Sequence, residues 1–164
     1  FFILYSMSRY FPIYINLAGK KVWVYGAGRI ALRRVTGLLR FGASVTVIAP
    51  EICEEIRALQ AQNTEQAVVL QRIYQSGEIP KGVDFVLAAT NDRKVNSRIC
   101  EECRRKGIPV NHASDSSQCD FYFPALVEQQ KLVIGVTSAD GDHKKVSRFC
   151  EKLRQQMQQD DLEY

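Results

Sequence analysis

A glycine-containing turn between an apolar run and an amphipathic run constrains this fold more than any other stretch of the chain. Residues 21–25 are mostly β-branched or aromatic, which is typical of a buried strand. Gly26, Gly28 and Ala31 follow at the spacing G-x-G-x-x-A. Apolar residues then recur at helical spacing over residues 30–39. Because the turn lies between a strand and a helix, its spacing predicts dinucleotide binding.

Each position of this turn has a physical role in holding a pyrophosphate. Gly26 permits a tight turn, Gly28 lets the backbone approach the phosphates, and Ala31 lets the helix pack closely on the strand. The free N–H groups and the positive dipole end of the helix then face the anion. We therefore expect Gly26, Gly28, Arg29 and Ile30 to bind the cofactor. The alternatives are a solvated side chain at Arg29 and a plain strand–helix connection for the whole turn.

Strand and helix patterns alternate through the first 115 residues. We expect strands at about residues 21–25, 44–49, 68–70, 83–89 and 108–111, and helices at 29–40, from 50 onward, and from 90–92 to 107. This alternation predicts an α/β fold with a Rossmann-type doubly wound parallel sheet. In such sheets, ligands bind beyond the carboxyl ends of the strands.

The expected strand ends supply the other cofactor candidates. Pro50 and Glu51 follow the second strand, and Glu51 could reach a ribose hydroxyl, although a place in the first turn of a helix explains it equally well. No arginine immediately follows that strand, so NAD is favoured over NADP. We expect Thr90 and Asn91, after the fourth strand, to line the nicotinamide side.

Composition is ordinary for a globular protein and excludes few functions. The net charge of +4 is not the dense basic stripe of a nucleic-acid-binding protein. Five cysteines and no evident secretory signal favour reduced thiols in the cytoplasm. The apolar opening FFILYS is too short for a membrane span, and Met7 could be the natural start. The pair Cys100 and Cys103 has no second pair at zinc spacing, so we expect a structural role and no metal site.

The chain changes character after about residue 115. Two strand-like runs, at 121–127 and 131–137, flank a polar turn, and an amphipathic helix starts near Asp142. We expect this helix to bury Val146, Phe149, Cys150 and Leu153. The region is too small to cover its own apolar surface, so we expect a partner chain.

Several motifs in series resemble one family. The stretch similar to it reads VWVYGAGRIALRRVTGLLRFGASVTVIAPE, then VLAATNDRKVN, IPVNHASD, FYFPALV and LVIGVTS. These motifs resemble precorrin-2 dehydrogenases, the NAD-dependent module of siroheme synthases. The resemblance implies an NAD-binding Rossmann domain at 1–115, a small α+β dimerisation region at 116–164, and a homodimer. It also implies oxidation of the tetrapyrrole precorrin-2 to sirohydrochlorin, with ferrous iron insertion, a lyase reaction, in some members.

The chain departs from the family pattern after the fifth strand. The family usually has an aspartate, the carboxylate most often proposed as the general base, at the position of Ser114; here the carboxylate is Asp115. A shift of one residue reverses the side-chain direction in an extended segment. The expected catalytic residues are therefore Asp115, His112 and Ser114. Asp115 could act as the general base, His112 could take over this role, or the activity could be lost. Asn111 and Ser138 are the expected substrate-binding residues.

Two other functions stay open from the sequence. A second departure from the family is Asp140, which adds negative charge to a loop of small residues where the anionic tetrapyrrole should lie. The departures at Ser114 and Asp140 favour a non-catalytic protein that carries or senses a tetrapyrrole or a dinucleotide. A chelatase with little dehydrogenase activity is the other alternative, and His112 is a candidate for iron ligation as well as for proton transfer. Asp115 and Ser138 also have a plainer interpretation as turn or capping residues.

Overall fold

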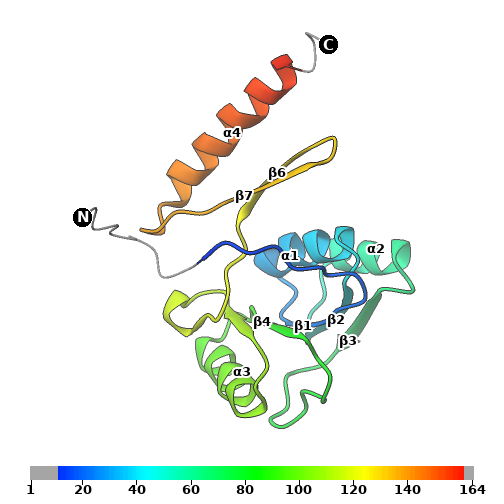
Figure 1. Cartoon of the computed structure of the whole chain (residues 1–164). Helices are drawn as coiled ribbons and strands as arrows, with labels where there is room; N and C mark the ends of the chain where they lie inside the picture. Colours follow the sequence, from blue (N-terminus) through cyan, green and yellow to red (C-terminus); the bar gives the residue numbers. More distant parts are fainter. Residues whose placement is uncertain (1–10, 161–164) are drawn as a thin grey trace, which may run out of the picture. The chain divides into compact units, whose positions relative to one another are not determined.

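The computed structural model describes residues 11–160, which form parts of two compact units. The first unit, residues 15–122, is built on a five-stranded parallel sheet in the order β3-β2-β1-β4-β5 (Figure 1). Its strands are β1 (Lys21–Tyr25), β2 (Ser44–Ala49), β3 (Ala67–Gln71), β4 (Phe85–Ala88) and β5 (Val110–His112). The strand order reverses direction between β1 and β4, so the predicted doubly wound sheet is confirmed.

Helices cover both faces of this sheet. Figure 1 shows α1 (Arg29–Arg40) and α2 (Glu54–Gln62) on one face and α3 (Arg93–Lys106) on the other. The buried face of α1 consists of Ala31, Val35, Leu38 and Leu39. Under α3, the core gathers Tyr25, Ile48, Val86, Ile99 and Val110. The apolar residues of α1 and of α3 occur at helical spacing in the sequence, so packing against the sheet explains why these two segments are helices.

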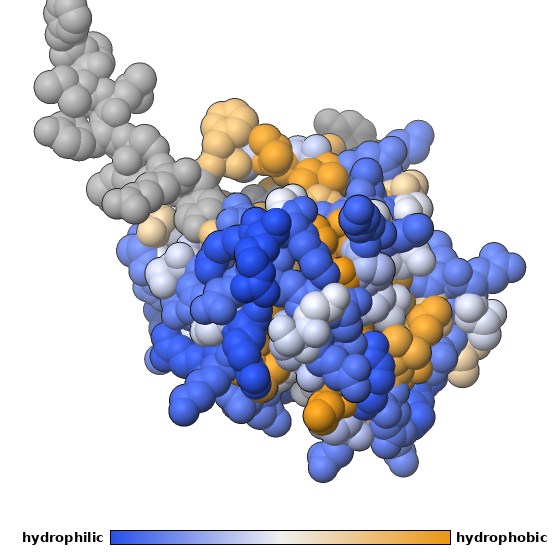
Figure 2. Space-filling model, turned by 90° about the horizontal axis from the view of Figure 1, so that it is seen from below, coloured by the Kyte–Doolittle hydropathy of each residue, from blue (hydrophilic) through white to orange (hydrophobic). Residues whose placement is uncertain are grey.

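The helix α3 has a cap at each end, a hydrophilic outer surface and two cysteines on its buried side. Asp92 caps the helix by accepting hydrogen bonds from Lys94 N and Val95 N, and Gly107 ends it in the left-handed conformation. Seen from the side of α3, the surface is largely hydrophilic (Figure 2). Cys100 and Cys103 are buried beneath it as free thiols, and burial raises the pKa of Cys100 to about 11. The two thiols are therefore part of the core, as predicted.

In the first unit, three element boundaries differ most from the prediction. The helix α2 begins at Glu54 and not at Pro50, because Cys53 is extended and the acidic pair Glu54 and Glu55 occupies the first turn, where the helix dipole favours them. The strand β4 is shorter than expected, at Phe85–Ala88. The strand β5 starts later and runs through His112, which places this side chain in the sheet.

The second unit contains residues 123–160 together with 11–14 among those described. An antiparallel pair, β6 (Ala125–Gln129) and β7 (Leu132–Val136), is joined through Gln130, whose φ of 51° makes the turn. The predicted start of the first strand at 121 is wrong, because Pro124 has no N–H to donate and β6 begins only after it. The helix α4 (His143–Asp160) packs on β6, and Arg154 donates to Leu126 O at 2.8 Å.

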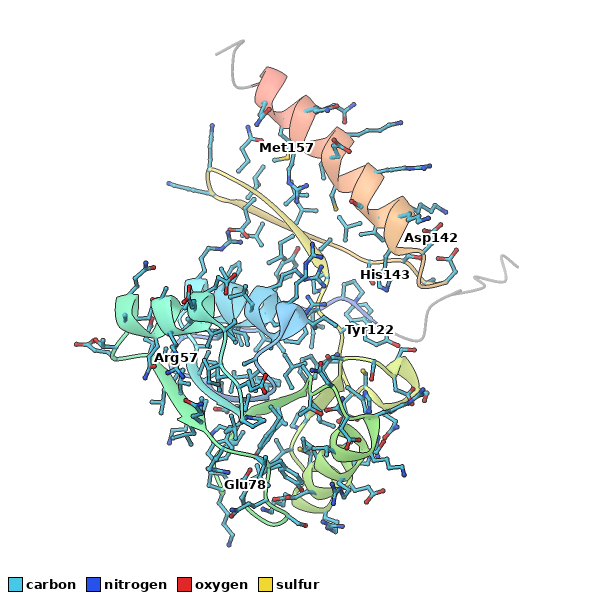
Figure 3. The ribbon with its side chains drawn as sticks, turned by 180° about the vertical axis from the view of Figure 1, so that it is seen from behind. Arg57, Glu78, Tyr122, Asp142, His143 and Met157 are labelled. Atoms are coloured by element: carbon cyan, nitrogen blue, oxygen red, sulfur yellow. The ribbon has the colours of Figure 1, made fainter. Side chains whose placement is uncertain are left out.

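The helix α4 does not bury all the residues expected. Cys150 is buried, but 56% of Phe149 is exposed. Figure 3 shows Asp142 and His143 at the start of this helix, and Asp142 caps it by accepting from Lys145 N at 2.9 Å. In the part of the chain that the structure describes, no helix combines the length and apolar character needed to cross a bilayer.

Candidate cofactor and active site

Backbone hydrogen bonds bring the predicted strand ends together at one edge of the sheet. Gly26 N donates to Ile48 O at 2.8 Å, Ala89 N to Tyr25 O at 2.7 Å, and Ala113 N to Ala88 O at 2.9 Å. These bonds continue the parallel ladders beyond the strands. The stretches 26–29, 49–51, 90–92 and 111–115, which are far apart in the sequence, therefore lie along the same carboxyl edge, as expected for a ligand site in this fold.

The two glycines of the first turn have different surroundings. Gly26 has a φ of 109°, and a Cβ added there would lie 2.2 Å from Ala89 O. Gly26 is thus required by the turn and by the close approach of the chain after β4. Gly28 is the N-cap of α1 with a φ of −84°, and a Cβ added there would meet no heavy atom within 4 Å. The space over Gly28 is open.

The N-terminus of α1 fits an anionic ligand. No side chain caps this helix, and its first turn holds no acidic residue. Its first N–H groups therefore remain available, and the dipole there favours negative charge. Arg29 and Ile30 are exposed in this turn, whereas Ala31 is fully buried against the sheet. These residues can hold the pyrophosphate of a dinucleotide, with an open approach over Gly28.

A buried asparagine that the sequence analysis missed shapes the turn after β4. Asn96 on α3 is 1% exposed, and its Oδ1 accepts from Thr90 N at 2.9 Å and Thr90 Oγ1 at 2.7 Å. Its Nδ2 donates to Thr90 O at 3.1 Å. Thr90, predicted to line the nicotinamide side, is therefore fixed, while Asn91 is exposed beside it. The signal available in the sequence was a polar residue next to Val95 on the apolar side of α3.

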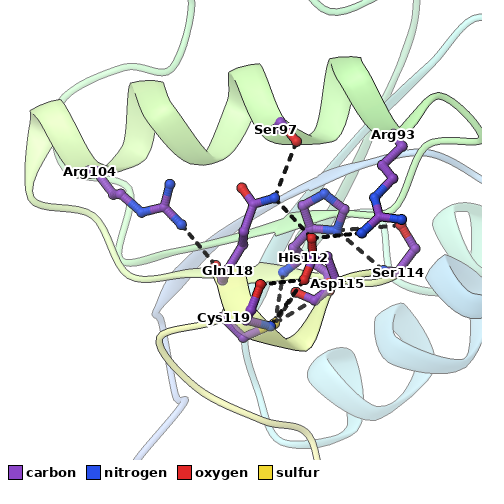
Figure 4. Close-up of polar contacts among 9 residues, drawn as sticks. Arg93, Ser97, Arg104, His112, Ser114, Asp115, Gln118 and Cys119 are labelled. Carbon is purple, nitrogen blue, oxygen red and sulfur yellow. Dashed lines mark hydrogen bonds and ion pairs between the residues drawn. The ribbon is translucent and has the colours of Figure 1, made fainter.

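Both oxygens of Asp115 are engaged (Figure 4). Oδ1 accepts from Ser117 N at 3.1 Å and Ser117 Oγ at 2.6 Å; Oδ2 accepts from Arg93 NH2 at 2.9 Å and Gln118 Nε2 at 3.1 Å. The hydrogen bonds from Ser117, then those from Arg93 and Gln118, hold the pKa of Asp115 far below its ordinary value. This carboxylate caps the short 3₁₀ helix η1 (Ser116–Gln118) and ties it to α3. Its partner Arg93 was also missed from the sequence.

His112 lies beside Ser114 at the end of β5 (Figure 4). The imidazole is 2% exposed, and its Nδ1 is 3.3 Å from Ser114 N and 3.5 Å from Ser114 Oγ. Its Nε2 has no hydrogen-bond partner among the described residues. Burial lowers the pKa of His112, so the ring is neutral at pH 7. Ser114 itself is exposed.

The remaining predicted site residues lie in β5, after β2 and in the second unit. Asn111 is 7% exposed, and its Nδ2 donates inward to Phe121 O at 2.8 Å. Glu51 is exposed after β2, and Pro50 O accepts from Gln71 Nε2 at 3.2 Å. Ser138 belongs to the second unit, where its hydroxyl accepts from Asp142 N at 3.1 Å in the turn before α4.

Comparisons with known proteins agree with this geometry. A family model described as "Putative NAD(P)-binding" matches residues 13–125. The solved structure of "SirC, precorrin-2 dehydrogenase" is similar to this chain with a TM-score of 0.76 and 28% identity, covering 90% of this chain and 71% of that one.

Two curated relatives are longer proteins. The "Probable multifunctional siroheme biosynthesis protein HemA" of Ruminiclostridium josui is 39% identical over 145 residues, which are 88% of this chain and 28% of that protein. The "Siroheme synthase" of Pseudoalteromonas translucida is 35% identical over 145 residues, 88% of this chain and 30% of that protein. This chain therefore spans less than a third of the length of either relative.

Proposed function

The chain belongs to this NAD(P)-binding family, and from that premise we propose that it oxidises precorrin-2 to sirohydrochlorin with NAD as the hydride acceptor. The observation that carries the proposal is the similarity to SirC, a precorrin-2 dehydrogenase, over 90% of this chain. The match to proteins of siroheme biosynthesis supports the same pathway. The uncapped and open N-terminus of α1 supports a dinucleotide as the cofactor.

NAD supplies the hydride chemistry, and the residues of this chain supply binding and orientation. We assign the pyrophosphate to Gly26, Gly28 and the first turn of α1, including Arg29 and Ile30. Thr90, fixed by Asn96, and Asn91 line the nicotinamide side.

The segment after β2 favours NAD over NADP. Glu51, Glu54 and Glu55 are all exposed between the end of β2 and the first turn of α2. In this fold the adenosine ribose lies near that strand end, where a carboxylate can accept a hydrogen bond from a ribose hydroxyl. Three carboxylates there repel the 2′-phosphate of NADP. Pro50 completes the turn that follows β2.

We assign the substrate side of the site to residues 111–115. Ser138, which lies in the second unit, stays a predicted substrate-binding residue. A dehydrogenation that transfers a hydride to NAD also releases a proton, so a proton acceptor must lie near the reacting carbon. Asp115, His112 and Ser114 lie together in this segment. Asn111, predicted to bind substrate, is buried and donates to Phe121 O.

The direct test is turnover of the purified protein. Incubation with precorrin-2 and NAD should produce the absorption spectrum of sirohydrochlorin together with NADH. NAD binding without turnover would instead favour a carrier or sensor of tetrapyrroles or dinucleotides. If the protein neither binds NAD nor oxidises precorrin-2, the proposal is rejected.

Iron insertion is a second candidate activity, favoured by the match to siroheme synthases. Within the described ranges, no group of three or more His, Cys, Asp or Glu side chains is placed to hold a metal ion. Ferrous iron as a substrate would therefore depend on the tetrapyrrole nitrogens for most of its ligands. Addition of ferrous or cobaltous ion to supplied sirohydrochlorin, without NAD, tests this activity separately.

We further propose that the protein is a cytoplasmic homodimer. The five cysteines form no disulfide with one another, as expected in a reducing compartment. The second unit exposes Phe149, Leu132 and Val133, at 56%, 60% and 38% of their surfaces. A small unit with so much exposed apolar surface is suited to association with a second copy.

A further inference from the structure

We infer that His112 accepts the substrate proton through the hydroxyl of Ser114, and that Asp115 is a positioning residue that fixes this segment on α3. The inference rests on the proposed dehydrogenase function and assigns roles within its site. It follows from how the three side chains are bonded.

The bonding of Asp115 leaves little basicity. Each carboxylate oxygen accepts two hydrogen bonds, and one of its donors is the Arg93 guanidinium at 2.9 Å. Donors to the ionised form stabilise it, so protonation of this carboxylate is strongly opposed. Gln118 also contacts Ser97 Oγ at 3.3 Å, which adds a second link to α3. The contacts of Asp115 therefore secure residues 115–118 against the helix.

The contacts of His112 define its tautomer. Ser114 N lies 3.3 Å from Nδ1, and a backbone N–H can only donate. Nδ1 must therefore carry the lone pair, and the ring hydrogen is on Nε2. Ser114 Oγ lies 3.5 Å from Nδ1, and its hydroxyl can donate to this lone pair. An exposed hydroxyl is thus backed by a buried, neutral imidazole.

The buried Nε2–H has no partner within the described part of the chain. Buried polar groups are nearly always hydrogen-bonded, and an apolar residue would fill a purely structural position without this cost. An unsatisfied imidazole at a strand end beside an exposed hydroxyl therefore points to function. The charged groups that influence this ring are Asp115, which favours its protonation, and Arg93 and Arg104, which oppose it. Burial has the largest effect and keeps the ring neutral.

The step balances with the proposed reaction. As the substrate loses a hydride to NAD, it loses a proton to Ser114 Oγ. The hydroxyl proton of Ser114 passes at the same time to His112 Nδ1, which becomes an imidazolium. Return of that proton through Ser114 to solvent restores both side chains. NAD is the only oxidant that the step requires.

Four variants separate the two assignments in the full chain. We expect His112→Phe to lower kcat by at least about 100-fold, the usual range for loss of a general base, and Ser114→Ala to lower it by about 10-fold or more. Asp115→Asn and Arg93→Gln should each lower kcat by about 5-fold or less, and the double variant should be no worse than either one, because they break the same link. NAD affinity should change little in all four.

The pH profile separates the roles independently of the size of these losses. With His112 as acceptor, kcat should fall as the pH drops through a pKa below 6.5, because the ring must be neutral. Asp115→Asn should leave this acid limb in the profile. A 100-fold loss in Asp115→Asn, with full activity in His112→Phe, would overturn the inference.

NMR of the ring nitrogens provides a readout without turnover. We expect the Nε2–H tautomer, a titration midpoint below 6.5, and a shift of the Nδ1 signal in Ser114→Ala, whose exposed site should fold normally. A proton on Nδ1, or a midpoint above 6.5, would also overturn the assignment. Absence of turnover in the wild-type protein rejects the proposed function; turnover that survives both His112→Phe and Ser114→Ala rejects only this inference.

Discussion

At the residue scale, the fold requires a glycine at the position of Gly26. Its φ of 109° is unfavourable for any side chain, and an added Cβ would lie 2.2 Å from Ala89 O, which is backbone and cannot swing away. We expect Gly26→Ala to lower the free energy of unfolding by about 3 kcal/mol or more. Urea unfolding measures this loss. An alanine variant of unchanged stability would show that the turn can relax.

Gly28 should respond in the opposite way. Its φ of −84° suits alanine, and nothing lies within 4 Å of the added Cβ, so Gly28→Ala should fold with an unchanged melting temperature. The methyl group would occupy the space over the α1 N-terminus that we assign to the pyrophosphate. We expect NAD affinity to fall at least about 10-fold, or about 1.4 kcal/mol, by calorimetry. Unchanged affinity would place the cofactor elsewhere.

The sequence predicts the glycine turn well because its demands are local. The ion pair between Asp115 and Arg93 is not local in this sense. The pairing of Asp115 with Arg93 joins residues 22 positions apart, and no periodic pattern marks it. The sequence therefore predicts that residues 111–115 carry the chemistry, while only the fold shows that both oxygens of Asp115 accept hydrogen bonds and that His112 is buried.

At the element scale, Glu102 fastens α3 to the segment between β3 and β4. It is 1% exposed and accepts from Tyr74 OH at 2.6 Å, Gly77 N at 2.8 Å, Ile79 N at 3.0 Å and Lys106 Nζ at 2.6 Å. Burial alone would raise the pKa of Glu102, but these donors outweigh it and lower the pKa to about 2.

We expect Glu102→Gln to destabilise the protein by about 3 kcal/mol at pH 7, because an amide cannot accept from four donors. The folded-state pKa lies below the unfolded value, so this stabilisation is complete above about pH 5 and is lost as the pH falls toward 2. The stability gap between wild type and variant should therefore narrow over this range in denaturant titrations. A difference in stability that stays constant down to pH 2 would show that the ionised carboxylate of Glu102 does not provide this stabilisation.

The interiors of the elements were predictable, and several of their ends were not. The apolar stripe of α1 defines residues 29–40 because it needs only local periodicity and the turns on either side. The start of α2 was misplaced at Pro50, since a proline is compatible with a first helical turn and only the extended Cys53 shows where the helix begins. The first strand of the hairpin, expected at 121–127, is Ala125–Gln129, because Pro124 delays its start and pairing continues to Gln129.

At the scale of the whole molecule, the two units differ in how well they bury their apolar residues. The first has an α/β core with Val24, Val86 and Ile99 fully buried. The second has a two-stranded sheet and one helix, which is too little to form an independent core. The sequence predicted this shortage, but it also predicted that Phe149 would be buried, and most of that side chain is exposed.

We expect the protein to sediment as a dimer at micromolar concentration if the exposed apolar side chains of the second unit form an interface. Phe149→Glu on α4 and Leu132→Glu on β7 place a charge where 56% and 60% of an apolar side chain is exposed. Burying an unpaired carboxylate in an interface is costly, so each change should weaken dimerisation at least about 10-fold.

Ile73→Glu is the matched control, because Ile73 is a comparably exposed apolar residue, at 64%, in the first unit. It should leave the sedimentation coefficient unchanged. A wild-type monomer at every concentration tested would reject the homodimer. Dissociation by Ile73→Glu alone would instead locate the interface on the α/β unit, and the exposed face of α4 would then need a different explanation.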